Sequence, residues 1–278
     1  ILIELVNDGQ FKDSFAFKGG TCLIKCYLGY YRFSEDMDFS YTNQQEFKNK
    51  TEKQIRRDLS EKIRWLMDML NGISNKLKID FRPEKHNKKY VELGGSNRFV
   101  TFKLWYNSEV LAVLSFVKIQ IIFVEKFIYK IKEARSRSLV KQNISKELTF
   151  LFPEYSHLLS TVSVRIYDIR EILLEKIRAI LTRKGIKARD FIDVFLIVNE
   201  VKLDLNSLED KIIAKTRFML KYEKYLQNLK TKSQEIGFVL GEEQKFLLKP
   251  LNKSFGKFLD EFSLFLQKLV RKLIEVEK

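Results

Sequence analysis

The spacing of hydrophobic residues changes along the chain from helical to strand-like and back to helical. A stripe of apolar residues at three- and four-residue spacing runs from Phe47 to Leu70 and stops at Gly72, which predicts one long helix. Between Lys76 and Lys126 apolar and polar residues tend instead to alternate, with turn residues between the runs. The strand-like runs are residues 14–18, 36–41, 77–81, 98–106, 110–124 and 161–166. The first five of these runs predict an α+β fold with a mixed sheet of about four or five strands.

Helical patterns dominate both ends of the chain. Residues 1–9 read as a helix that ends at Gly9, and a capping-box-like start at Asp168 opens a helix over residues 169–184. Further helices are expected over residues 208–229 and 253–276, the last of them amphipathic and basic. We therefore predict an α+β domain over residues 1–166 and a helical C-terminal domain over residues 167–278.

The composition is that of a folded protein with an anionic partner. The 278 residues are 45% hydrophobic, and no apolar run reaches membrane-spanning length, so we expect a cytoplasmic protein without a membrane segment. Cys22 and Cys26 lie four apart on one helix face, a geometry that suits packing and not a disulfide. The net charge of +15 favours nucleic acid as a partner, although lysines spread over all solvated faces would give the same total. The basic segment from Lys126 to Lys146 has the same two interpretations, a nucleic-acid path or a solvated loop.

A glycine turn near the N-terminus is a candidate anion site. The strand-like run ending at Lys18 is followed by Gly19 and Gly20, and Thr21 then starts a helical pattern that reaches Leu28. Glycines allow close approach of a ligand to the backbone, and a helix N-terminus favours an anion, with the Thr21 hydroxyl at the N-cap. Taken alone, the pattern also fits an ordinary Gly-Gly turn.

Two aspartates follow on the next predicted strand. Asp36 and Asp38 are separated by Met37, so strand periodicity places both carboxylates on one face while Met37 and Phe39 face the core. Carboxylates so close together repel each other, and bound cations would keep both ionised. The simpler alternative is a solvated acidic edge strand.

A third group of charged residues lies in the predicted helical domain. Lys176 and Arg183 share a helix face with apolar residues, and a lysine in that position needs an anion unless it reaches water. Asp190 and Asp193 follow near the start of the next helix, where Arg189 is placed to form an ordinary helix pair with Asp193.

These motifs resemble those of a known enzyme family. Gly19-Gly20-Thr21, an intervening helix and Arg32-Phe33-Ser34-Glu35-Asp36-Met37-Asp38 are similar to the nucleotidyltransferase motif of the DNA polymerase β superfamily, and more narrowly to AbiEii toxins and their MenT relatives. Residues 175–193 resemble the later motifs of that family, in which a lysine and an aspartate complete the site.

The resemblance implies a polymerase β-like fold and a set of site residues. It implies that Asp36 and Asp38 bind Mg²⁺ or Mn²⁺, that Lys176 contacts phosphate, and that Asp190 or Asp193 orients it or activates the acceptor. The nucleotide-binding candidates are Lys18, Gly19, Gly20, Thr21, Arg32, Ser34, Lys176 and Arg183.

One position departs from the expected pattern. Polymerase β-like enzymes carry a third carboxylate on a neighbouring strand, and we expect it here in a Lys-Ile-acid sequence. This chain has Lys118-Ile119-Gln120. Gln120 is a possible third ligand, but an amide cannot act as a base. Either a later aspartate completes the set, or catalysis is slow or absent.

The resulting hypothesis is a toxin that transfers a nucleoside monophosphate from a nucleoside triphosphate to an acceptor hydroxyl. The favoured acceptor is the 3′ end of tRNA, and the resemblance implies a cognate antitoxin and a role in phage defence. A protein hydroxyl such as that of Ser34 is the competing acceptor. The alternative function is a catalytically silent module that binds nucleotide or RNA.

Overall fold

The computed structural model describes residues 1–109, 112–138, 147, 150–153, 159–232 and 247–275. The chain forms two compact units, each assembled from separate segments. The sheet unit comprises Ile1–Cys26, Ser34–Glu125 and Ile131–Ile166, and the helical unit comprises Tyr27–Phe33, Lys126–Lys130 and Tyr167–Lys278.

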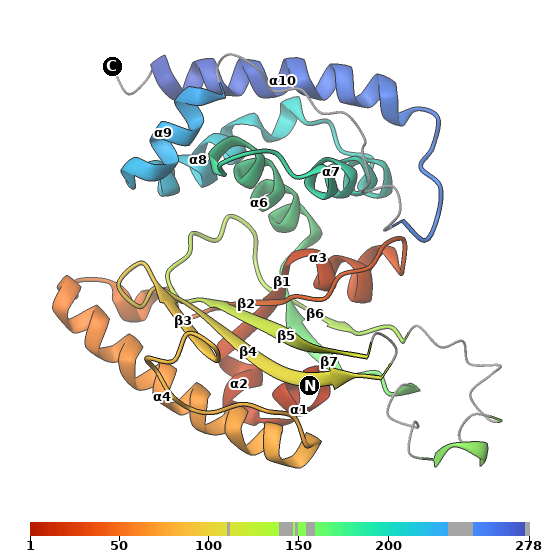
Figure 1. Cartoon of the computed structure of the whole chain (residues 1–278). Helices are drawn as coiled ribbons and strands as arrows, with labels where there is room; N and C mark the ends of the chain where they lie inside the picture. The colour runs from red at the N-terminus through yellow and green to blue at the C-terminus, as the bar shows by residue number, and fades with distance from the viewer. Residues whose placement is uncertain (110–111, 139–146, 148–149, 154–158, 233–246, 276–278) are drawn as a thin grey trace. The chain divides into compact units, whose positions relative to one another are not determined.

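The sheet unit contains a mixed sheet of seven strands among the described residues, in the order β3-β4-β5-β2-β1-β7-β6 (Figure 1). The strands are β1 (Phe15–Lys18), β2 (Met37–Tyr41), β3 (Val91–Gly94), β4 (Phe99–Ser108), β5 (Val113–Ile122), β6 (Lys132–Arg135) and β7 (Ser163–Ile166). The pairs β2–β5 and β1–β7 are parallel and the others are antiparallel. This sheet, with helices packed on it, confirms the predicted α+β class.

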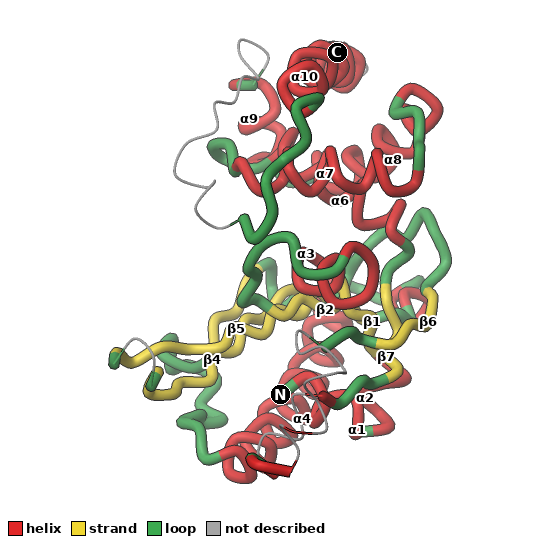
Figure 2. The backbone as a smooth tube through the Cα atoms, turned by 90° about the vertical axis from the view of Figure 1, so that its right-hand side faces the viewer, coloured by secondary structure: helices red, strands yellow, loops and turns green. Residues whose placement is uncertain are grey.

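The two faces of the sheet differ in character. Helices α1 (Leu2–Asn7), α2 (Gly9–Ser14) and α4 (Glu52–Leu77) lie on one face, and α3 (Gly19–Cys22) lies on the other (Figures 1 and 2). Phe15 stacks on Trp65 of α4 with 6.3 Å between ring centroids, and Phe17 stacks on Phe39 at 5.1 Å. Because side chains alternate along a strand, Lys18 and Asp38 project from the opposite face.

The predicted number of strands was too low, and one predicted strand is wrong. Strands β3 and β6 are four-residue edge strands, too short and polar to show a clear alternation. The alternating run over residues 77–81 is not a strand, because α4 continues to Leu77 and Lys78 then adopts a left-handed conformation with φ 55°. Only an isolated bridge between Asp80 and Trp105 remains of it.

Two glycines do not end helices as predicted. Gly9 begins α2, where Asp8 caps the helix by accepting a hydrogen bond from the Phe11 amide at 2.8 Å. Helix α4 passes through Gly72, and burial of Ile73 on the packed face offsets the cost of about 1 kcal/mol for a helical glycine. The apolar stripe of α4 is buried as predicted, although Phe47 lies in a separate turn, η2 (Gln44–Phe47).

The helical unit confirms a helical C-terminal region. Its helices are α6 (Ile169–Thr182), α7 (Ala188–Val201), the turn η4 (Asn206–Leu208), α8 (Glu209–Leu220), α9 (Glu223–Thr231) and α10 (Phe255–Glu275). The single helix predicted over residues 208–229 is in fact two, with a break at Lys221 and Tyr222. The predicted end of the last helix at Val276 lies outside the described residues.

A buried ion pair holds the segment Lys126–Lys130 in the helical unit. Glu171 does not complete the predicted capping box; only Asp168 caps α6, accepting from the Arg170 amide at 2.9 Å. The Glu171 carboxylate instead accepts from the amides of Ile128 and Tyr129 at 2.9 and 2.7 Å and pairs with fully buried Lys215 at 2.8 Å.

Two compositional predictions can be compared with the structure. Cys22 and Cys26 are buried free thiols, as predicted. No helix in the described part of the chain combines the length and apolarity needed to cross a membrane. Part of the basic segment from Lys126 to Lys146, namely residues 139–146, lies outside the described residues, and the role of this segment as a nucleic-acid path stays a prediction.

Candidate active site

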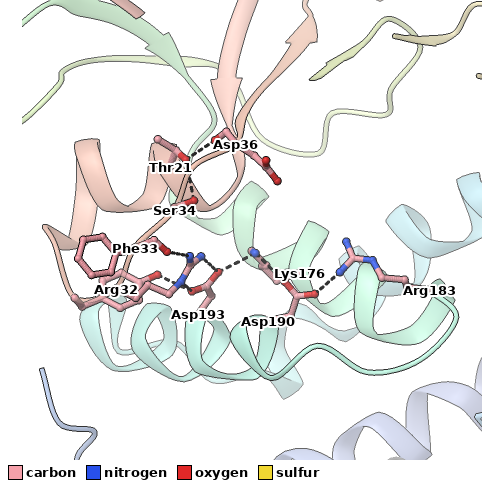
Figure 3. Close-up of polar contacts among 10 residues, drawn as sticks. Thr21, Arg32, Phe33, Ser34, Asp36, Lys176, Arg183, Asp190 and Asp193 are labelled. Carbon is pink, nitrogen blue, oxygen red and sulfur yellow. Dashed lines mark hydrogen bonds and ion pairs between the residues drawn. The ribbon is translucent and has the colours of Figure 1, made fainter. Parts of the chain in front are cut away.

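The glycine turn, Gly19 and Gly20, follows β1 directly and forms the start of α3, and it is tied to the segment that carries the aspartates. The Thr21 hydroxyl lies 2.8 Å from Ser34 Oγ and within hydrogen-bonding distance of the Asp36 carbonyl oxygen (Figure 3). Thr21 is not the N-cap as predicted, because the helix already begins at Gly19. Its hydroxyl instead fixes the position of the Ser34–Asp36 backbone beside the turn.

Gly19 allows the Asp38 carboxylate to pack directly against the turn. Its φ is +75°, and a Cβ added there would lie 2.2 Å from Asp38 Oδ2. A side chain could occupy that space only if Asp38 moved. The first glycine of the motif is therefore required both by its backbone conformation and by the neighbouring aspartate.

Replacing Gly19 with alanine is expected to lower the free energy of unfolding by about 1–3 kcal/mol and to displace Asp38, because both φ and the close contact oppose a Cβ. Gly72→Ala is the matched control, since nothing lies within 4 Å of its added Cβ and alanine favours the helix interior. Urea unfolding of both variants tests this. Equal stability of Gly19→Ala and the wild type would contradict the geometry.

Gln120 lies on a strand next to β2, where the resemblance led us to expect a third acid. Parallel pairing of β2 with β5 sets Asp38 directly beside Gln120, so their side chains project from the same face. Gln120 donates a hydrogen bond from Nε2 to Thr101 Oγ1 on the next strand at 3.1 Å. Its role as a metal ligand stays a prediction.

Asp36 forms an ion pair that was not predicted. Its Oδ2 lies 2.8 Å from Lys118 Nζ, and each side chain is 28% exposed. Strand periodicity could have revealed the pair, because Lys118 is two residues before Gln120 and so shares its face. The Asp36 carboxylate thus already holds one cation, the ammonium of Lys118.

The oxygen atoms of this cluster fit a hard divalent cation. No group of three or more His, Cys, Asp and Glu side chains suited to a metal occurs among the residues that the structure describes. Mg²⁺ does not need such a group, because it commonly binds one or two carboxylates and completes its coordination with water and substrate phosphates. Asp36 and Asp38 supply two carboxylates, which meets that requirement, and Gln120 lies beside Asp38 on the neighbouring strand.

Lys18, a predicted nucleotide-binding residue, is 4% exposed. Its ammonium lies 3.5 Å from the carboxylate of Glu125, which is also buried. This pair neutralises both charges inside the sheet unit. A phosphate contact by Lys18 stays a prediction.

A buried charge network in the helical unit centres on Asp193 (Figure 3). Arg32 donates to both carboxylate oxygens, from Nε and from Nη2, at 2.8 Å each. The Tyr31 hydroxyl donates to Oδ1 at 2.6 Å, and Lys176 Nζ lies 2.8 Å from Oδ2. Asp193 therefore bonds with distant partners, whereas Arg189, its suggested helix partner, is exposed.

Asp190 extends the same network. It accepts from Lys176 Nζ at 2.8 Å and from Arg183 at 2.6 Å (Figure 3). The structure thus brings Arg32, Lys176, Arg183, Asp190 and Asp193 together, and the ammonium of Lys176 lies between two carboxylates. Lys176 does point at anions, as its position on an apolar face suggested, but those anions belong to the protein.

The network keeps its members charged. Burial alone would raise the pKa of Asp193, but the charges and hydrogen bonds of Lys176 and Arg32 outweigh it and hold that pKa well below its usual range. The pKa of Asp190 is lowered in the same way, since Lys176 and Arg183 outweigh its burial. Burial would lower the pKa of Lys176, yet the two aspartates raise it.

The mixed sheet, the glycine turn, and the two aspartates just before and within β2 are the features on which the resemblance to nucleotidyltransferases rests. The sequence matches the family described as "Nucleotidyl transferase AbiEii toxin, Type IV TA system" over residues 1–270, and the chain belongs to that family. The predicted resemblance to AbiEii proteins is confirmed.

More distant likenesses exist among solved structures. One is JHP933 from Helicobacter pylori, with 15% identity and a TM-score of 0.41, covering 99% of this chain and 91% of that chain. Another is a candidate nucleotidyltransferase from H. pylori, also with 15% identity and a TM-score of 0.41, covering 100% of this chain and 95% of that one. No curated protein matches the sequence significantly.

Proposed function

We propose that this protein transfers a nucleoside monophosphate from a nucleoside triphosphate to an acceptor hydroxyl. The observation that carries the proposal is the packing of Asp38 against Gly19, with Asp36 tied to the same turn through Thr21. A glycine turn allows phosphates to approach the backbone, and two adjacent carboxylates suit a divalent cation that accompanies them. Family membership supports the same reaction.

Asp36 and Asp38 would hold Mg²⁺ or Mn²⁺, which when bound neutralises charge on the triphosphate. Gly19, Gly20 and Thr21 would approach the phosphate oxygens, and Ser34 keeps its place through Thr21. In this reaction the acceptor oxygen bonds to the α-phosphorus, the bond to the β-phosphate oxygen breaks, pyrophosphate leaves, and the acceptor proton passes to solvent or a basic group.

In the helical unit, Lys176 is the proposed phosphate-binding residue. Its side chain is 13% exposed, and Asp190 and Asp193 fix its direction. Asp193 is fully buried and acts as a positioning residue that also fixes Arg32. Preorganised charge of this kind contributes much of the catalysis in phosphoryl transfer, because no reorganisation is needed during the reaction.

The proposed acceptor is RNA, with the 3′ end of tRNA as the favoured substrate. The net charge of +15 supports contact with a polyanion. A tRNA offers a single-stranded 3′ hydroxyl that can enter an open metal site. Membership of a type IV toxin family implies an antitoxin partner, and we propose that the protein acts as the toxin in the cytoplasm.

A catalytically silent module that binds nucleotide or RNA is the second candidate. The amide at Gln120, where the family pattern leads us to expect an acid, favours it. Such a protein would bind nucleoside triphosphate with Mg²⁺ without transferring label.

Incubation with each α-labelled nucleoside triphosphate, Mg²⁺ and total RNA is expected to label a small RNA at its 3′ end. RNA labelling should fall steeply between about 50 and 200 mM salt, because binding through several phosphates releases counterions. Self-modification at Ser34 would leave the label on protein after RNase treatment and would depend little on salt. Bound nucleotide with no label on RNA or protein would contradict transfer and favour the silent module.

A further inference from the structure

One of the two carboxylates at the proposed metal site, that of Asp36, forms an ion pair with Lys118. The cluster of Asp36, Asp38, Lys118 and Gln120 carries two negative charges, one positive charge and a neutral amide, a net charge of −1. Two other lysines that project from this face also pair with carboxylates, since Lys18 lies beside Glu125 and Lys103 bonds with Glu92. A bare divalent cation therefore meets one net negative charge in this cluster, and the Asp36 carboxylate is already paired with an ammonium.

We propose that Lys118 is an internal counter-cation, which opposes metal binding at Asp36 until the nucleotide substrate binds. This inference rests on the proposed function. A bare metal ion must displace the ammonium from Asp36 and then remain beside it, which is unfavourable for two cations. A triphosphate brings several negative charges and offers Lys118 another partner. Metal and nucleotide consequently bind together, and metal alone binds weakly.

The position of Lys118 suits such an exchange. Its backbone is fixed, because β5 pairs with β2 on one side and with β4 on the other. Its side chain is 28% exposed and has a flexible four-carbon stem, so the ammonium can leave Asp36 without any change in the strand. Gln120 strengthens the effect, because an acid there would make the cluster charge −2 and let metal bind without nucleotide.

The test measures binding of Mn²⁺ alone, by electron paramagnetic resonance of the free ion, to the full chain without nucleotide. Lys118→Met keeps the length of the side chain but removes its charge. Lys103→Met is the matched control, because Lys103 lies directly opposite Lys118 on β4 and pairs with Glu92 instead. Gln120→Glu changes the cluster charge by the same amount as Lys118→Met.

Lys118→Met and Gln120→Glu are each expected to bind Mn²⁺ about three- to tenfold more tightly than the wild type, with Lys103→Met within about twofold. Adding a non-hydrolysable triphosphate should tighten Mn²⁺ binding more in the wild type than in Lys118→Met. Unchanged or weaker binding by Lys118→Met, while Gln120→Glu binds more tightly, would overturn the role of Lys118 and leave the proposed function standing. Equal Mn²⁺ binding by the wild type and Asp36→Asn would overturn the metal site itself.

Discussion

Replacement of Asp36 or Asp38 with asparagine is expected to lower nucleotide transfer by about 100- to 1,000-fold. Asparagine keeps the shape of the side chain and one oxygen ligand but removes the negative charge that a divalent cation needs. Asp38 also packs against Gly19, so the isosteric change is preferable to alanine. The measurement is single-turnover transfer of label from the α-phosphate.

Asp58→Asn is a suitable control for this loss. Asp58 lies on α4 and pairs with Lys50 at 2.6 Å, so the control also removes one paired carboxylate from the sheet unit. Asp58→Asn should keep full activity. In urea, the free energy of unfolding of all three variants should lie within about 1 kcal/mol of the wild-type value. Wild-type rates in both Asp36→Asn and Asp38→Asn would refute the proposed site.

The second large effect is expected on stability, from Asp193→Asn. This change removes the charge of the carboxylate to which buried Arg32 donates and leaves Lys176 with Asp190 alone, and loss of one partner of a buried ion pair costs about 3–5 kcal/mol. Urea unfolding of the wild type and variant measures it. Glu261→Gln is the control, because Glu261 forms an exposed 3.7 Å helix pair with Lys257 and should matter by less than about 0.5 kcal/mol.

The stability difference should also depend on pH in a defined direction. The folded-state pKa values of Asp190 and Asp193 lie below the ordinary value of 3.8, so these groups bind protons more readily in the unfolded chain. The two ionised carboxylates contribute fully to the free energy of unfolding when the pH is above 3.8. This contribution is lost as the pH falls from 3.8 towards their folded-state pKa values. The difference in the free energy of unfolding between the wild type and Asp193→Asn should therefore become smaller below about pH 4. A gap that stays constant down to pH 2 would show that the Asp193 charge contributes little.

Local patterns predicted the parts of the site that depend on neighbouring residues. Strand periodicity placed Asp38 away from the core, and the family pattern placed Gln120 on an adjacent strand, where β2 and β5 do pair. Gly19 was correctly placed in a tight turn. Its second requirement, the contact with Asp38, could not be predicted because it depends on how β1 and β2 pair.

Long-range ion pairs were beyond the reach of sequence spacing. The Arg32–Asp193 pair joins residues 161 positions apart, and spacing suggested the nearer Arg189 instead. Glu171 fitted a capping box, yet burial beside Lys215 gives its carboxylate a stronger partner. Strands β3 and β6 were missed because edge strands carry little hydrophobic signal. The error at residues 77–81 arose because α4 extends to Leu77 and Lys78 then turns the chain, which leaves room for only one bridge, at Asp80.

Each of the two units is built from separate segments of the chain, and this arrangement limits how the gene can recombine. The helical unit includes Tyr27–Phe33 and Lys126–Lys130, which are encoded within the part of the gene that otherwise specifies the sheet unit. A genetic exchange just after the codon for Ile166 would separate Asp193 from Arg32, and Glu171 from the amides of Ile128 and Tyr129. Recombination with a diverged relative would then leave buried charges without their partners. Selection should consequently keep both halves of the gene together, so that they evolve as one block and not as exchangeable modules.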